Sequence, residues 1–153
     1  MIGSAGILQG NAVLLAGMPW AETPVDLPGL AVASSHALIE AGVLLTVQAY
    51  VLNCTASRLS GLVLQPRSFT NAGMEFLDYA SCPSREDLAL PDLAPGDFVA
   101  RTFTYRVTER DASHGGPIIA ALAVLMDTQE GRFKVAEQDV LVQVHNLEVA
   151  GIR

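Results

Sequence analysis

The stretch from residue 93 to residue 107 constrains the fold more than any other part of the chain. It contains Pro95-Gly96-Asp97, which is typical of a tight turn because proline fixes φ and glycine tolerates a positive φ. Residues 98–107 follow at once, rich in β-branched and aromatic side chains and free of glycine and proline, which predicts a strand. A long strand that starts from a Pro-Gly turn is typical of a β-sandwich.

Two further segments predict strands with similar clarity. Residues 43–52 alternate apolar and mixed side chains at period two, and residues 118–126 are an apolar run between Pro117 and a polar turn. Residues 59–64 are expected to form a hairpin with 43–52 and to end at Pro66. The shorter strand candidates are 11–15, 30–33, 75–79, 133–135 and 140–144, with a short helical turn at 84–87 and a polar connection at 108–117.

These segments together predict an all-β fold, a two-sheet antiparallel β-sandwich of about seven strands. Turn signals recur every 8–15 residues and no amphipathic helix is evident. The length of 153 residues suits one ordinary domain with additional ends. The half of the chain that is apolar is enough to fill a core.

Charge and hydropathy exclude two classes of partner. The net charge of −7 and the absence of a Lys/Arg cluster argue against a nucleic-acid-binding surface. No apolar run reaches the roughly 20 residues that a membrane-spanning helix needs.

The segment Asp111-Ala112-Ser113-His114-Gly115-Gly116 is the most enzyme-like part of the sequence. Its Ser, His and Asp suggest a hydrolase, and its glycines could lend N–H groups to an oxyanion. However, members of a catalytic triad meet in space and not as sequence neighbours, and the G-x-S-x-G pattern is absent. A polar loop between two strands explains the segment, so we expect no catalytic residues and no enzyme.

No pattern typical of a metal or cofactor site is present. The three histidines (His36, His114 and His145) lack the spacing of zinc ligands. The acidic residues Glu86, Asp87, Asp92 and Asp97 lack the spacing of a calcium loop, so solvated turn charges explain them better. We therefore expect neither a bound metal nor a cofactor.

Two modifications are suggested by short patterns. Asn53-Cys54-Thr55 fits the N-x-[ST] acceptor sequence, which makes Asn53 a candidate for N-glycosylation. In a secreted protein, Cys54 and Cys82 could form a disulfide across the sheet. The alternative for the two cysteines is that both are small buried hydrophobic residues.

The order of these parts resembles a known family. Residues 27–32 read LPGLAV, residues 40–64 read EAGVLLTVQAYVLNCTASRLSGLVL, and residues 93–111 read LAPGDFVARTFTYRVTERD. Residues 28–144 resemble the Ig-like repeat of large surface proteins known as domain of unknown function eleven. The resemblance implies an Ig-like sandwich over 28–145, the end of a preceding repeat or a linker over 1–27, and a linker or a following repeat over 146–153.

The resemblance also implies a function. The chain would be a structural or adhesive module, one repeat of a cell-surface, wall or filament protein such as an algal wall or mastigoneme-like glycoprotein. Its expected partners are neighbouring repeats and other copies, and its location extracellular or at the cell surface. Two alternatives stay open: a carbohydrate-binding β-sandwich, which normally displays aromatic side chains on one exposed face, and a small hot-dog-fold acyl-thioester enzyme, which needs a long central helix.

Overall fold

Seven strands and two short helices form from residues 27–146, which are the residues that the computed structural model describes. The strands are β1 (Gly29–Ser34), β2 (Leu38–Ile39), β3 (Leu44–Leu52), β4 (Leu62–Thr70), β5 (Phe98–Arg106), β6 (Pro117–Thr128) and β7 (Gly131–Val144). The helices are α3 (Arg85–Leu88) and α4 (Glu109–His114). The predicted strand at 11–15 and most of the two predicted flanking segments lie outside the described residues.

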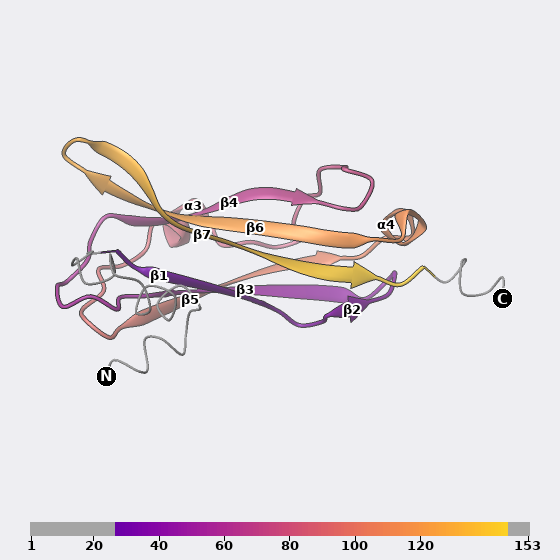
Figure 1. The fold of residues 1–153 in the computed structure, drawn as a ribbon, viewed down its shortest axis with the longest axis horizontal. Helices are drawn as coiled ribbons and strands as arrows, with labels where there is room; N and C mark the ends of the chain where they lie inside the picture. Colours follow the sequence, from indigo (N-terminus) through magenta and orange to yellow (C-terminus); the bar gives the residue numbers. More distant parts are fainter. Residues whose placement is uncertain (1–26, 147–153) are drawn as a thin grey trace, which may run out of the picture.

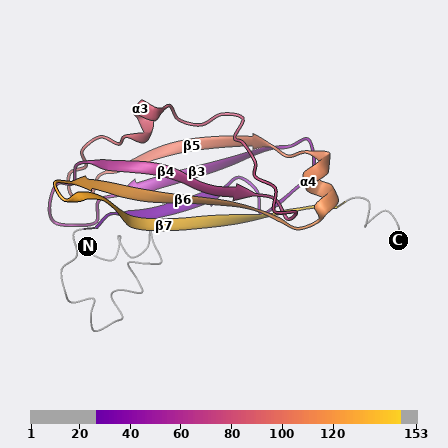
Figure 2. The same ribbon diagram turned by 90° about the horizontal axis from the view of Figure 1, so that it is seen from above.

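The strands build two sheets that stack face to face (Figures 1 and 2). Sheet 1 has the order β1-β3-β5, and sheet 2 has the order β2-β7-β6-β4. Neighbouring strands run antiparallel, except that the short β2 pairs in parallel with the end of β7. The predicted all-β, two-sheet sandwich is therefore confirmed, with one parallel pair added.

The core lies between the sheets and follows the alternation of the strands. On β3 every second residue from Leu45 to Val51 is buried, and the second half of β5 alternates in the same way, whereas residues 120–125 of β6 are buried on both faces of the strand. Burying one such aliphatic or aromatic side chain contributes about 1.5–3 kcal/mol, so the facing rows supply the main driving force for this arrangement. The rows are Leu45, Val47, Ala49 and Val51 on β3, Phe103 and Tyr105 on β5, and Ile118, Ala120, Leu122 and Val124 on β6.

The hairpin expected between residues 43–52 and 59–64 is wrong. β3 pairs with β1 and β5, whereas β4 lies in the other sheet and pairs with β6. β4 also continues past Pro66 as far as Thr70, with a bulge between Pro66 and Phe69. Proline has no N–H to donate to a neighbouring strand. It is tolerated in β4 because β4 is an edge strand, so an N–H on its outer side would have no strand to bond.

Three smaller expectations also differ from the structure. Residues 75–79 form no strand and contribute a single bridge between Thr70 and Phe76. The polar connection at 108–117 contains α4, and the last two predicted strands are one continuous strand, β7. The predicted helical turn is confirmed as α3, whose N-terminus is capped by Ser84, since the Ser84 hydroxyl oxygen accepts from the N–H of Asp87.

Candidate functional site

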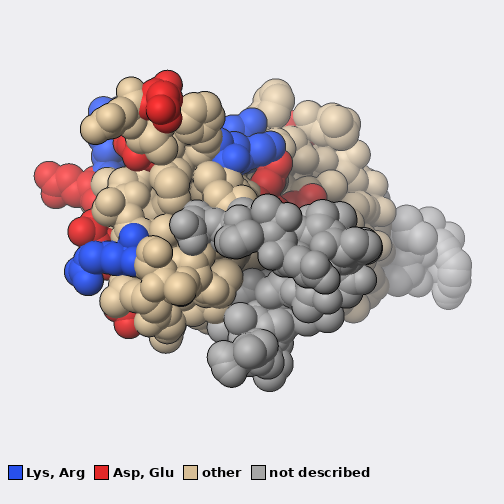
Figure 3. All heavy atoms as spheres, turned by 60° about the vertical axis from the view of Figure 1, so that its left-hand side comes forward, with Lys and Arg blue, Asp and Glu red and all other residues tan. Residues whose placement is uncertain are grey.

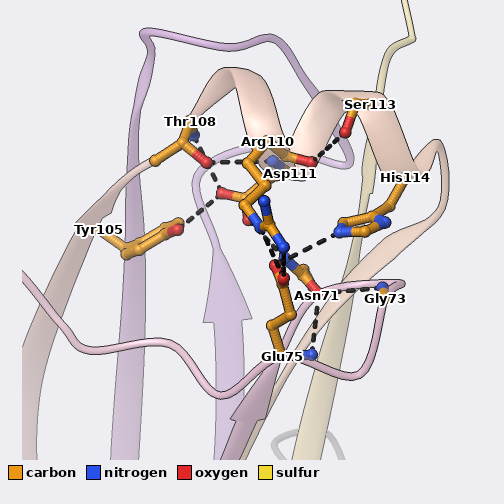
Figure 4. Close-up of polar contacts among 9 residues, drawn as sticks. All are labelled: Asn71, Gly73, Glu75, Tyr105, Thr108, Arg110, Asp111, Ser113 and His114. Carbon is orange, nitrogen blue, oxygen red and sulfur yellow. Dashed lines mark hydrogen bonds and ion pairs between the residues drawn. The ribbon is translucent and has the colours of Figure 1, made fainter.

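The densest group of polar contacts lies at one end of the sandwich, around α4 (Figure 4). We call it the α4 cluster, and it joins the end of β4 and the loop after it, the end of β5, and α4. Its members are Asn71, Glu75, Tyr105, Thr108, Arg110, Asp111 and His114.

The carboxyl group of Asp111 is the centre of the cluster. The residue is only 1% exposed. Its Oδ2 accepts hydrogen bonds from the Tyr105 hydroxyl at 2.6 Å and from the backbone N–H of Thr108 at 3.0 Å, and its Oδ1 accepts one from Asn71 Nδ2 at 2.9 Å. These bonds satisfy the buried carboxyl group, whose burial without hydrogen-bond partners would cost folding free energy. Burial, and after it the contact with Asp111, raises the pKa of Tyr105.

The local sequence explains why α4 begins here. The Thr108 side chain accepts from the N–H of Asp111 while Asp111 accepts from the N–H of Thr108, which is the reciprocal arrangement of a capping box. Gly115 ends the helix at a φ of 62°, a conformation that glycine adopts without steric cost. The spacing T-x-x-D followed by a glycine was the signal in the sequence that could have revealed this helix.

Asn71 shapes the loop that follows β4. It is 3% exposed. Its Oδ1 accepts from the N–H groups of Gly73 and Glu75, and its Nδ2 donates to Asp111 and to Glu75 Oε1. The loop also packs tightly, because a Cβ on Gly73 would collide with the His114 ring.

Glu75 links this loop to α4 by charge. Its Oε2 accepts a hydrogen bond from Arg110 Nε at 2.6 Å, and its Oε1 lies 3.3 Å from His114 Nε2. The bond from Arg110, followed by the bond from Asn71, lowers the pKa of Glu75 to about 2. The carboxylate is therefore ionised across the ordinary pH range and holds its two partners in place.

The α4 cluster does not form the hydrolase arrangement considered from the sequence. Ser113 Oγ donates to the carbonyl of Arg110, His114 lies against Glu75, and Asp111 is bonded to Tyr105 and Asn71. The side chains of Ser113, His114 and Asp111 therefore make no hydrogen bond with one another in the described part of the chain. The geometry does something else: it fixes the position of residues 71–76.

The fixed loop displays two large apolar side chains to solvent. Met74 is 77% exposed and Phe76 is 84% exposed, the highest values among the large hydrophobic residues in the range 27–146. Met74 also has a φ of 64°, a region that side chains other than glycine rarely occupy. We call residues 71–76 the display loop.

A groove of about 440 Å³ lies beside the display loop. Its walls include Pro66 and Phe69 of β4 together with Phe76, Tyr79 and Cys82 of the segment after it. The rings of Phe69 and Tyr79, which both line the groove, stack at a centroid distance of 4.1 Å. Burial raises the pKa of Tyr79, whose buried hydroxyl has no hydrogen-bond partner within residues 27–146.

Asn53, the candidate glycosylation residue, is fully buried. Its Nδ2 donates both hydrogens, to the carbonyls of Ser57 at 2.7 Å and Leu93 at 2.8 Å, and its Oδ1 accepts from Thr55. A glycan replaces one of these hydrogens and needs a path to solvent, so the folded structure is unfavourable for it. The residue has a structural role that the sequence pattern did not suggest.

Cys54 and Cys82, the two cysteines of the predicted disulfide, are both exposed and unpaired in the structure. Cys54 follows Asn53, which bonds to Asp97, whereas Cys82 follows Ser81, which pairs with Thr104. Seven positions separate Asp97 from Thr104 along β5, which is roughly 23 Å at about 3.3 Å per residue. A disulfide needs Cα atoms closer than about 7 Å.

The other residues considered from the sequence are dispersed. His36 contacts Ser35, and His145 lies 3.7 Å from Glu40. Among residues 27–146, no three His, Cys, Asp or Glu side chains are grouped as metal ligands would be. Within the same residues, neither helix is long and apolar enough to cross a membrane.

Comparison with known proteins gives similarity in structure alone. No protein-family model matches the chain, and no curated protein matches it in sequence. The cohesin module of a family 33 glycoside hydrolase from Clostridium perfringens has a TM-score of 0.50 at 9% identity, over 79% of this chain and 98% of that one. The CARDB domain of a Pyrococcus furiosus protein gives 0.45 at 15% identity, over 80% and 98%. The similarity to the cohesin module extends to the fold alone.

Proposed function

We propose that the chain is an extracellular β-sandwich module, one repeat of a cell-surface, wall or filament protein, that works by assembling with other copies and not by catalysis. The observation that carries the proposal is the display loop, which holds Met74 and Phe76 in solvent beside a groove of mixed lining that contains several aromatic side chains. The resemblance of residues 28–144 to surface-protein repeats supports the extracellular setting, and the cohesin-like sandwich is compatible with a modular protein.

The display loop has the properties of a binding element. Exposed aromatic and methionine side chains are enriched where proteins bind one another, and a few such residues usually dominate the binding energy. The α4 cluster holds the loop in one conformation, so less conformational entropy is lost when a partner binds. The positive φ of Met74 is a local strain of the kind that persists at functional positions.

The groove and the loop are together suited to a second copy of the same surface. Phe76 is both an exposed side chain and part of the groove wall. A two-fold axis passing near Phe76 would place the Phe76 of each copy in the groove of the other, and self-complementary contacts of this kind define symmetric dimers. At about 440 Å³ the groove lies within the roughly 300–1,000 Å³ typical of ligand pockets, so it has room for a side chain.

Sedimentation velocity over a range of concentrations tests the assembly. The wild-type chain is expected to associate, and Phe76→Ser is expected to weaken the association roughly tenfold or more. Phe133→Ser is the matched control. Phe133 is 51% exposed and lies on β7, outside the display loop and the groove. A wild-type chain that stays monomeric into the millimolar range, or equal effects of the two variants, would overturn the proposal.

The extracellular setting needs a separate experiment. Labelling of intact cells with a membrane-impermeant biotin reagent is expected to modify the native protein. Recovery of the protein unlabelled, alongside labelled surface proteins from the same cells, would contradict the proposed location while leaving the assembly test unaffected.

A further inference from the structure

The outer face of sheet 1 is a second surface with a distinct chemical character. Its members alternate with the buried residues and are paired across the strands by the register. They are Ala31 and Ala33 on β1, Leu44, Thr46, Gln48 and Tyr50 on β3, and Phe98, Ala100, Thr102, Thr104 and Arg106 on β5.

This face is almost free of charge although the chain carries a net charge of −7. Among its described members only Arg106 is charged, and its guanidinium donates to the carbonyl of Gly42 at the end of the sheet. The outer face of sheet 2, by contrast, carries Glu137 and Asp139 opposite Ala123 and Ala121. Figure 3 shows both positive and negative groups on the side of the molecule that it presents.

The middle of the face is a fixed row of hydrogen-bonding groups. The Tyr50 hydroxyl donates to Gln48 Oε1 at 2.6 Å, and Gln48 Nε2 donates to Thr102 Oγ1 at 3.2 Å. Each of these hydroxyl and amide groups can both donate and accept, and each has bonding capacity left after the bond within the row. The hydroxyl groups of a sugar have the same dual capacity, whereas a charged ligand would find no counter-charge within this row.

An aromatic pair lies at one end of this row. The rings of Tyr50 and Phe98 have centroids 6.5 Å apart and are tilted by 52°, and Phe98 is 62% exposed. A pyranose ring presents C–H groups on its faces and hydroxyl groups around its edge. Aromatic faces beside a hydroxyl and amide row therefore match both parts of a sugar, and the two residues that flank Tyr50 across the sheet, Ala31 and Ala100, have small side chains.

We infer that the outer face of sheet 1 binds a neutral polysaccharide chain, through ring stacking on Tyr50 and Phe98 and hydrogen bonds to Gln48 and Thr102. The carbohydrate-binding alternative required several aromatic side chains on one exposed face, and the fold places two there from strands that are distant in sequence. This site is separate from the display loop, so it stands or fails independently of the proposed assembly.

Native affinity electrophoresis of the full chain tests this inference. The gels contain hydroxyethyl cellulose, galactomannan or dextran, and polygalacturonate serves as the anionic comparison. We expect at least one neutral polymer to retard the wild-type chain and polygalacturonate to leave it unretarded. Phe98→Ala should weaken the retardation about tenfold, and Gln48→Ala should weaken it by a smaller factor.

Two controls make the result specific. Phe133→Ala removes a comparably exposed ring from sheet 2 and should leave retardation unchanged, and Phe76→Ser should do the same while weakening self-association. Circular dichroism checks that each variant keeps the wild-type fold. Retardation by none of the neutral polymers, stronger retardation by polygalacturonate, or equal losses in Phe98→Ala and Phe133→Ala would overturn the inference.

Discussion

Two buried asparagines, one at each end of the sandwich, perform the same task with different partners. Asn53 follows β3 and Asn71 follows β4, and they are 0% and 3% exposed. Each side-chain oxygen organises the turn after its strand. The amide of Asn53 donates to two backbone carbonyls, whereas the amide of Asn71 donates to the carboxyl groups of Asp111 and Glu75.

The difference separates a structural end of the sandwich, around Asn53, from the end around Asn71 that carries the exposed display loop, which we call the presenting end. Asn53 binds only neutral groups, and its backbone is further bonded to Asp97 and Gly96 in the turn before β5. Asn71 instead connects an exposed loop to a helix through ionisable side chains, so the position of that loop depends on charge. Asn53 therefore stabilises the turn at one end of the fold, whereas Asn71 at the other end positions the loop that exposes Met74 and Phe76.

The largest effect is expected from Asp111→Ala, which removes the centre of the Asn71 end. Tyr105, Asn71 and the N–H of Thr108 would lose their acceptor in a buried place, which costs about 3–5 kcal/mol of unfolding free energy. Urea unfolding measures this. Glu109→Ala, an exposed change in the same helix, should cost little. If Asp111→Ala lost less unfolding free energy than Asn53→Ala, the α4 cluster would not contribute more stability than the bonds of Asn53.

Asn53→Asp is expected to have the next largest effect and to make the neutral end sensitive to pH. A carboxylate cannot donate to the Ser57 and Leu93 carbonyls, so we expect a loss of about 2–4 kcal/mol at neutral pH. Burial would raise the pKa of the new carboxyl above its unfolded value, so part of the stability should return as the pH falls and the acid regains a donor. Asn53→Ala should lose about 2 kcal/mol at every pH, and a pH-independent Asn53→Asp would contradict this account.

The Asn71 end of the wild-type protein should itself weaken in acid. The folded pKa of Glu75 is lowered to about 2, first by Arg110 and then by Asn71. A depressed folded pKa contributes stability above the unfolded pKa of about 4.3, and that stability is lost as the pH falls toward 2. The urea midpoint should therefore drop between pH 5 and pH 2, and less so in Glu75→Gln. Glu137→Gln is the control, because the pKa of Glu137 is also lowered. If the urea midpoint of Glu75→Gln fell in acid as much as that of the wild type, the role of Glu75 would be refuted.

How far the sequence reveals this molecule depends on whether a signal is local. β3, β5 and β6 could be predicted because their alternation and apolar runs are continuous in sequence. The partner of β4 could not be predicted, because the residues of a strand do not indicate whether the chain stays in the same sheet or crosses to the other one. The α4 cluster was missed for the same reason, since Asn71 and Asp111 are 40 positions apart and meet only in the fold. Asn53 was noticed for its sequon, and its burial is a property of the turn that encloses it.

Met74→Gly is the smallest change in this series and tests whether the presenting end carries strain. Glycine accepts a φ of 64° without steric cost, so the variant should be more stable by about 1 kcal/mol, as measured by urea unfolding. Met74→Ala is the matched control, because it removes the same side chain but keeps the unfavourable backbone. Both variants should associate more weakly than wild type if the Met74 side chain contributes to assembly, and only the glycine variant should gain stability. Equal stability of the two variants would show that the Asn71 turn holds Met74 without strain, and the contrast between a strained presenting end and an unstrained structural end would then be lost.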